Sequence, residues 1–579
     1  MAKKPSEEVL SRALKHSVSV SGEYRTMLTV LRDKWLNFYS LYRIFKTEQG
    51  MPWNSKLYIP RIFEVIEKLA PRMTSHNPSF TITPKKEEAR DQADLLSVYL
   101  EYIWEEQGLK NKIRQLAKNQ LIYGTAIAKV DWFMETKKSK VSETKTNEEG
   151  EEEEVVLTRD VVTNEMPKFE VVDIFDILID PRDEDEDSGA GIFHKRDFVE
   201  YSELLANKDI YFNLDEVKQK LISLDYQDND DTEQQEKHTK KGVVNNAEEV
   251  NKNKLSLKEY WGLFSPTDEP EDEEEYIITT INDSIVIRCE RNEFGIRPFV
   301  AIHDARIPGE FFGVGEVEPL ESLQVELNWL RNQRMDNVNL ALNKMWLVDT
   351  DTDVNPSQLV SRPGGVIFKS PNSVIQPLDF PDVTSSSYAE EDRIGRDIQT
   401  ISGIIDVTDR GGESGFTNTA TGQRIRASEQ NTRVQAKIEN LEEGIRKIAK
   451  KMLILAEKFS DDSVLFREFL ENGEVEFIKT TKDLFKNVTN GISIRVETGS
   501  TSADSSFDRR NDALALYNLG LSAKQAGVPV DLVKLWKDVV QKGFGFKNPS
   551  ETLEKGAGGG EEIPPELAAL QDETTSLLQ

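Results

Sequence analysis

EVEPLESLQVELNWLRNQRMDNVNLALN, residues 316–343, predicts one long helix and begins the order of elements that decides the fold. At ~1.5 Å per residue such a helix would extend about 42 Å. Residues 345–380 then have the pattern of short strands, and residues 383–403 return to a helical pattern. A small β segment therefore separates two helices in the middle of the chain.

The clearest periodicity lies in residues 423–459, where apolar side chains recur at alternating spacings of four and three. These side chains are Val434, Ile438, Leu441, Ile445, Ile448, Met452, Leu455 and Phe459. The spacing is an a/d seam over about three and a half heptads. It fits either a coiled coil between chains or a helix buried against its own chain. We favour the second interpretation, which is the commoner one inside a mixed α/β chain.

The part of the chain before residue 316 mixes helices with strands. Helical patterns cover 20–47, 60–70 and 86–122, and Pro71 is expected to end the second helix. Strand patterns cover 125–133, 155–163, 168–174, 256–264, 276–289 and 298–302, with a hairpin turn at Asn282-Asp283. The polar stretches 137–154 and 226–254 are predicted to be exposed loops. After residue 459 we expect strands at 463–469, 474–479 and 491–497, then helices at 507–526 and 528–542.

Length and charge limit the class of protein. A chain of 579 residues predicts two or more domains. Its net charge of −30 argues against a sequence-reading DNA binder, which needs basic patches, but not against a protein that handles DNA without holding it. The single cysteine, Cys289, excludes an intrachain disulfide. We expect neither a signal peptide nor a membrane span, because no stretch approaches the roughly 20 apolar residues required.

No catalytic motif stands out. The sequence lacks the P-loop, H-E-x-x-H and G-x-S-x-G patterns. The histidines lie far apart, and no two have the helical spacing of metal ligands: His16, His76, His194, His238 and His303. We therefore expect no enzymatic activity, no metal and no cofactor.

Three weaker patterns each have a functional and an ordinary interpretation. The acidic run Asp180–Asp187 has the carboxylates of a hard-cation site but lacks the EF-hand glycine and glutamate, so a solvated loop is favoured. Gly313-Val314-Gly315 resembles half of a phosphate loop, but a flexible helix entry is favoured. His303-Asp304 could be a base with its orienting carboxylate, but a loop after a strand is favoured because no nucleophile accompanies it.

Five short motifs occur in a particular order along residues 20–545. They are Trp53-Asn54-Ser55 with Tyr58-Ile59-Pro60 and Ile62-Phe63; Gln120 to Ala126 leading into Lys129 to Trp132; Phe175-Asp176 to Asp180-Pro181; Gly313 to Glu316; and Leu323-Gln324 with Leu327-Asn328 to Asp336. In this order they resemble the portal proteins of tailed bacteriophages.

The resemblance implies an α+β, multidomain fold, predominantly helical with small β segments, that assembles as a ring. It implies the following division: an N-terminal wing at 1–315, a first stem helix at 316–344, a clip at 345–381, a second stem helix at 382–404, a tunnel loop at 405–422, a long helix with wing return strands at 423–500, crown helices at 501–555 and a mobile tail at 556–579. The short Gly- and Glu-rich tail departs from portals that have a long C-terminal helical barrel, so we do not expect such a barrel.

The resemblance also implies a role and partners. A portal subunit forms a ring, expected to have twelve subunits, at one capsid vertex and gives double-stranded DNA a channel for packaging and ejection, without sequence-specific binding. The implied partners are the terminase large subunit, the major capsid or scaffold protein, and a head-completion or tail adaptor protein. The protein would be assembled in the host cytoplasm and reside in the virion.

Three groups of residues are candidates for this role. The tunnel loop offers candidate DNA contacts: Asp406, Asp409, Arg410, Gly411, Gly412, Glu413 and Gly415. The first stem helix offers candidate stem or lumen charges: Glu316, Glu318, Glu321, Glu326, Arg331, Arg334 and Asp336. The clip offers two candidate docking residues, Arg362 and Lys369.

Two alternatives remain open at the level of sequence. One is a nuclease of phage DNA processing with a carboxylate metal site, for which the sequence offers only charge runs in expected loops. The other is a different virion scaffold or connector protein that oligomerises through the 434–459 heptad helix. The portal hypothesis accounts for the β segment between two long helices, and the scaffold hypothesis does not.

Overall fold

The computed structural model describes residues 4–43, 54–75, 77–146, 152–222, 254–267, 269–342, 345–348, 359, 375–378, 385–404, 420–460, 465–469, 475–479, 482–485, 488–496, 503–525 and 532–540. It mixes helices with antiparallel sheets, which confirms the α+β class. Contacts divide the chain into two compact units, Met1–Asp462 with Thr481–Ala503, and Ser463–Thr480 with Asp504–Gln579.

A five-stranded antiparallel sheet forms one part of the first unit. Its order is β4 (Ile177–Ile179), β5 (Gly191–Glu200), β6 (Lys254–Phe264), β7 (Glu274–Ile281) and β8 (Ile285–Arg291). The hairpin predicted at Asn282-Asp283 is confirmed. Both residues have left-handed backbone angles, φ 48° and 50°, as a type I′ turn requires. Helices α5 (Tyr201–Ala206) and α6 (Leu214–Ile222) bury Leu204 and Val217 in an apolar cluster with β5, β6, β7 and β8.

Four helices lie before β2 in the chain: α1 (Glu7–Arg43), α2 (Arg61–Met73), α3 (Arg90–Glu106) and α4 (Lys110–Tyr123). The expectation that Pro71 ends α2 is wrong. Pro71 lies in the last turn of α2, and the Thr74 amide donates to the Ala70 and Pro71 carbonyls there. The single helix expected at 86–122 is divided near Gly108, whose φ of 58° is left-handed.

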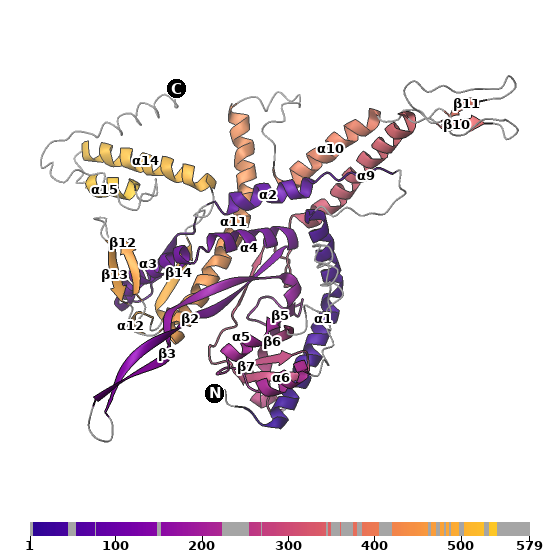
Figure 1. Ribbon diagram of the computed structural model, residues 1–579. Helices are drawn as coiled ribbons and strands as arrows, with labels where there is room; N and C mark the ends of the chain where they lie inside the picture. The colour runs from indigo at the N-terminus through magenta and orange to yellow at the C-terminus, as the bar shows by residue number, and fades with distance from the viewer. Residues whose placement is uncertain are drawn as a thin grey trace. The chain divides into compact units, whose positions relative to one another are not determined.

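A long two-stranded ribbon, β2 (Thr125–Thr146) with β3 (Glu152–Val172), extends from the first unit (Figure 1). The loop expected at 137–154 is therefore wrong for its described residues. The register places Lys145 opposite Glu153 and Lys138 opposite Asp160. Strand β9 (Phe299–His303) pairs with β2 only at its first five residues. Most of the loop expected at 226–254 lies outside the described residues.

Helix α11 (Ala420–Phe459) confirms the long helix expected at 423–459 and begins three residues earlier. Seven of the eight seam side chains are buried, and Phe459 is partly exposed. Ala449, Leu453 and Ala456, off the seam, are also buried, because α2, β2, β3, β9 and β14 pack against the helix. A helix whose apolar side packs against elements of the same chain belongs to the core of that chain. The favoured interpretation of the heptad is confirmed, and its use as a coiled coil between chains loses its basis.

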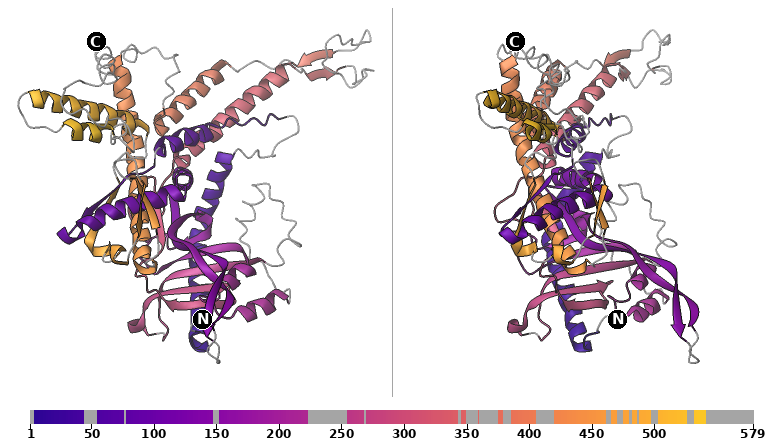
Figure 2. Two further views of the ribbon diagram at one scale, coloured as in Figure 1. Left: turned by 60° about the vertical axis from the view of Figure 1, so that its left-hand side comes forward. Right: turned by 90° about the vertical axis from the view of Figure 1, so that its left-hand side faces the viewer.

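Helices α9 (Val317–Leu342) and α10 (Ser385–Ser402) lie side by side as an antiparallel hairpin, which confirms the two helices expected there (Figures 1 and 2). Between them in sequence, β10 (Met345–Val348) pairs antiparallel with β11 (Ile375–Leu378). The strand expected at Gly365–Phe368 lies outside the described residues.

A strand near the C-terminal end of the first unit pairs with a strand near its N-terminal end. Strand β1 (Phe80–Pro84) pairs antiparallel with β14 (Ile492–Val496), and the short helices α12 (Lys482–Phe485) and α13 (Val488–Gly491) precede β14. Three short 3-10 helices are η1 (Glu87–Ala89), η2 (Ile174–Asp176) and η3 (Pro270–Asp272). The second unit contains the pair β12 (Leu465–Phe469) and β13 (Val475–Lys479), and the helices α14 (Ala503–Gln525) and α15 (Leu532–Asp538).

Candidate functional site

The α9–α10 hairpin is held by one carboxylate. Glu391 of α10 accepts two hydrogen bonds of 2.9 Å from Arg331 and a further bond from Arg334, both on α9. The Arg334 guanidinium, which is buried, also lies over the ring of Tyr388 at 4.2 Å. Charge-assisted bonds of this kind are stronger than neutral ones and fix orientation. The two helices are therefore joined as one rigid arm with β10 and β11 at its end.

An extended segment of the chain, residues 55–61, is bound along the side of α9. The backbone amides of Ser55, Leu57 and Ile59 donate to the side chains of Asp336, Asn332 and Asn328, at 2.6, 2.7 and 2.9 Å. The Arg61 amide donates to Gln324 at 3.1 Å. These acceptors are spaced four residues apart on the helix and two apart on the extended segment.

The two spacings match because the rises match. Four helical residues advance about 6 Å and two extended residues about 6.6 Å. Side chains at i, i+4, i+8 and i+12 of α9 can therefore reach alternate amides of the extended segment. The first and last of the five motifs noted in the sequence, which are more than 250 residues apart, thus bind each other.

The beginning of α9 is fixed at a junction where α4, β9, α9 and α11 meet. We call Gly124, Asp304, Gly313, Glu316 and Lys437 the α9 junction. The Glu316 amide donates to the Leu121 carbonyl at 2.8 Å, and the Asp304 amide donates to the Gly124 carbonyl at 2.9 Å. A Cβ atom on Gly124 would overlap the Gly313 carbonyl, so the backbones touch directly.

A partly buried lysine completes the junction. The Lys437 ammonium on α11 lies 2.6 Å from Asp304 and 2.6 Å from Glu316. Burial alone would lower the pKa of Lys437, but the two carboxylates outweigh it and raise that pKa. Burial raises the pKa of Asp304 to about 6 against the opposing effect of Lys437. Two carboxylates and one ammonium therefore tie the start of α9 to α11.

Two patterns from the sequence acquire a different meaning here. Gly313-Val314-Gly315 is not a flexible helix entry, because its glycines allow close backbone contact with Gly124. His303 ends β9 and Asp304 follows it, as expected. Asp304 bonds to Lys437, while His303 faces Phe311, and burial lowers the pKa of His303 to about 4. The pair does not have the geometry of a base and its orienting carboxylate.

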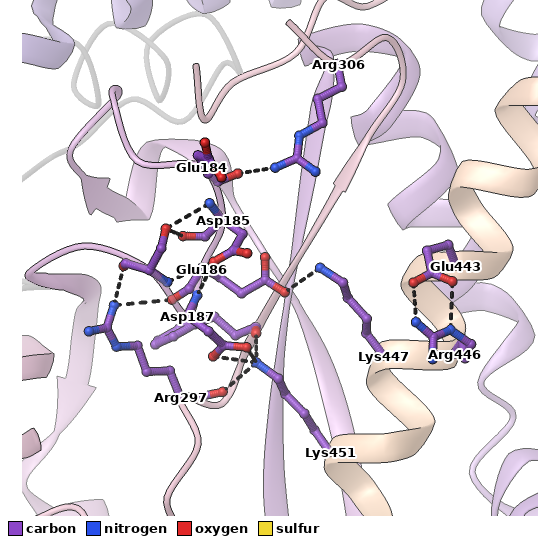
Figure 3. A network of polar contacts seen from close by, with 12 residues as sticks. Glu184, Asp185, Glu186, Asp187, Arg297, Arg306, Glu443, Arg446, Lys447 and Lys451 are labelled. Atoms are coloured by element: carbon purple, nitrogen blue, oxygen red, sulfur yellow. Dashed lines mark hydrogen bonds and ion pairs between the residues drawn. The ribbon is translucent and has the colours of Figure 1, made fainter. Parts of the chain in front are cut away.

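The acidic run Asp180–Asp187 also differs from a solvated loop. Glu186 is buried and accepts from Lys447 at 3.1 Å, and Asp187 accepts from Lys451 at 3.0 Å (Figure 3). Lys451 also donates to the Arg297 and Phe299 carbonyls at 2.8 and 2.7 Å. Lysines one turn apart on α11 thus bind this loop. Within the described ranges, no group of three or more His, Cys, Asp and Glu residues could hold a metal ion.

Of the seven candidate stem residues, five make contacts within the chain. Arg331 and Arg334 bind Glu391, Asp336 binds the Ser55 amide, Glu318 binds Lys34, and Glu316 binds Lys437. Glu321 and Glu326 have no ion-pair partner in the part of the chain that the structure describes. The clip candidates Arg362 and Lys369 lie outside the described residues, as do all the tunnel-loop candidates: Asp406, Asp409, Arg410, Gly411, Gly412, Glu413 and Gly415.

Sequence reasoning missed several residues that hold the arm in place. Glu391 and Lys437 lie in helices whose charges looked ordinary, and nothing local identifies their distant partners. The acceptors Gln324, Asn328 and Asn332 do have a detectable signal. They are amide side chains at four-residue spacing on one predicted helix, and with Asp336 they form a polar stripe.

Comparison with known proteins agrees with this architecture. Residues 137–575 match the family described as phage SU10 portal protein, which is a structural family and not one of enzymes. No curated protein matches the chain. Among the described residues, no helix has the length and apolar character needed to cross a membrane. Because the match spans most of the chain, including both helices of the arm, the protein belongs to the phage SU10 portal protein family of tailed-phage portals.

Proposed function

We propose that this protein is the subunit of a ring, of twelve copies, at one vertex of the capsid, and that double-stranded DNA passes through the ring during packaging and ejection. The observation that carries the proposal is the α9–α10 arm with the β10–β11 pair at its end. This is the order of stem helix, clip and stem helix expected at 316–344, 345–381 and 382–404, in a chain of the portal family.

The charge of the chain suits a conduit. Each copy contributes a net charge of −30, so a ring would have a strongly negative surface. A negative, hydrated channel repels phosphate, whereas basic patches would hold DNA through salt-dependent binding. DNA would then slide without being bound. The tunnel loop at 405–422 supplies the close contact, through Asp406, Asp409, Arg410, Gly411, Gly412, Glu413 and Gly415.

The tip of the arm is the proposed docking site for partners. The clip segment 345–381 would receive the terminase large subunit first and a head-completion or tail adaptor protein afterwards. Arg362 and Lys369 are the proposed docking residues on the motor side. Charge reversal at both positions should weaken motor binding without changing the mass of the ring, and unchanged motor binding would contradict this assignment.

Native mass spectrometry of the purified protein, with negative-stain images of the same sample, tests the proposal. A ring with a central channel and a mass near twelve times 65.9 kDa is expected. A small helical oligomer without a channel would contradict the proposal. A ring of another subunit number would correct the stoichiometry and leave the channel in place.

A further inference from the structure

A shallow, open groove with apolar and acidic side chains runs along the outer face of α9. It is lined by Glu318, Glu321, Ser322, Val325, Glu326 and Trp329. Trp329 is 61% exposed and Val325 is 54% exposed. Tryptophan is the residue most enriched at the energetic centres of protein interfaces, and leaving one in water forgoes much of its burial energy.

The groove lies on the side of the arm that faces away from α10. Trp329 is five residues from Arg334, which is about 140° around a helix of 3.6 residues per turn. Arg334 faces α10 through Glu391. The groove therefore remains accessible once the hairpin is formed, and its acids Glu321 and Glu326 have no ion-pair partner within the described residues.

The opposite side of the arm presents two arginines, Arg393 and Arg396, between the exposed carboxylates of Asp392 and Asp397. Arg396 of α10 is exposed and lies five residues from Glu391, again about 140° from the contact with α9. Arg393, one turn away, is paired among the described residues with the partly exposed Glu390, at 3.3 Å. Such a surface pair contributes little and can be exchanged for another partner.

The groove and the two arginines also lie at the same height along the arm. From the Arg334–Glu391 contact, Trp329 lies five residues toward the base of the arm on α9, and Arg396 lies five residues toward the base on α10. Both are therefore about 7.5 Å below that contact. Copies related by rotation about an axis keep the same height along it, and a repeated contact between two different faces generates a ring when the rotation closes.

We propose that the α9 groove of one copy receives Arg393 and Arg396 of α10 from the next copy, with an arginine over Trp329 and ion pairs to Glu326 and Glu321. This interface rests on the proposed ring and specifies the partner as a second copy of this chain. Guanidinium groups suit this groove because they stack on tryptophan and form paired bonds with carboxylates.

Charge exchange tests the interface directly. Arg396→Glu and Glu326→Arg should each lower the fraction of ring at a fixed concentration by at least about tenfold, and combining them in one chain should restore most of it. Lys208→Glu, a reversal at an exposed turn of the first unit, is the matched control and should leave the ring unchanged. Single variants without effect, or a combined variant that is no better than either, would overturn the proposal.

Cross-linking separates the interface from the ring itself. A Val325→Cys, Arg396→Cys variant treated with a short bismaleimide should give a ladder of covalent oligomers, while each single variant should not. The natural Cys289 is buried and should not react. A ring without a covalent ladder would overturn this interface and leave the proposed function standing. A wild-type chain that forms no ring would overturn both.

Discussion

The α9 junction lies where α9 begins and the α9 groove lies along that helix, and both contain carboxylates, but these carboxylates are satisfied in different ways. At the junction, Glu316 and Asp304 are buried and share the ammonium of Lys437. On the groove, Glu321 and Glu326 face outward and have no ion-pair partner among the described residues. The difference indicates that one set of carboxylates fixes the fold of a chain, whereas the other is available to a second molecule. Variants should therefore divide into those that unfold the chain and those that change only its assembly.

Gly124→Ala should have the largest effect, because it breaks the junction through the backbone. The added Cβ would overlap the Gly313 carbonyl and lie 2.7 Å from the Gly315 nitrogen, and φ at Gly124 is 81°. We expect a loss of more than about 4 kcal/mol in the free energy of unfolding, measured by urea denaturation. Gly108→Ala is the control, since φ is 58° there but no atom lies within 4 Å. It should cost only about 1 kcal/mol, and equal losses would show that the contact with Gly313 does not matter.

Lys437→Ala should have the next largest effect. It leaves Asp304 and Glu316 buried without their counter-ion, and breaking a buried pair in this way costs about 3–5 kcal/mol. The control is Lys450→Ala on the exposed side of the same helix, which should change the free energy of unfolding by less than about 0.5 kcal/mol. A loss below about 1 kcal/mol for Lys437→Ala would mean that the junction does not depend on this charge.

The pH dependence of stability sharpens the same contrast. Burial raises the pKa of Asp304 from 3.8 to about 6. Protonation of Asp304 therefore adds to the free energy of unfolding in full below pH 3.8, and this contribution is lost as the pH rises through 6. Burial, with Arg306 and Lys447, lowers the pKa of His303 from 6.5 to about 4. The contribution of neutral His303 to the free energy of unfolding is therefore present above pH 6.5 and is lost as the pH falls toward 4.

These two neighbouring contributions oppose each other between pH 4 and 6. Asp304→Asn removes the Asp304 contribution, which increases as the pH is lowered. The free energy of unfolding of this variant should therefore fall more steeply toward acid than that of the wild-type chain. Urea midpoints at several pH values measure this slope. An unchanged slope in Asp304→Asn would show that Asp304 titrates alike in the folded and unfolded chains.

Much of the fold could be predicted because it depends on local patterns. The helix expected at 316–343 is α9, the heptad is the buried side of α11, and the turn at Asn282-Asp283 follows from residues that tolerate a left-handed backbone. The strand residues 137–146 and 152–154 of the ribbon were missed because a polar sequence lacks the alternating apolar pattern that marks a half-buried strand. Pro71 was misjudged because α2 keeps its helical geometry to Met73, although proline supplies no amide for the bond to the carbonyl four residues earlier.

The site could be predicted only in part. The seven charges at 316–336 remain candidates for a stem, and a sequence does not reveal which of them has a partner far along the chain. Arg331 and Glu391 illustrate this, since their pairing depends on the antiparallel return of α10. Glu326 lies on the same helix but lines the groove and does not face α10. Only the three-dimensional structure separates these two positions.

The smallest effects on the chain itself should come from the groove. Glu186→Gln weakens a buried contact with Lys447 and should cost about 1–2 kcal/mol in urea denaturation. Glu326→Gln removes the same charge from an exposed position and should change the free energy of unfolding by less than about 0.5 kcal/mol. Assembly should respond in the opposite order, with the ring weakened by Glu326→Gln and little affected by Glu186→Gln at concentrations where both chains are folded. If Glu326→Gln instead lowers the free energy of unfolding and leaves the ring unchanged, the partner of this carboxylate lies within its own chain. Glu326 would then stabilise the fold, as the carboxylates of the junction do.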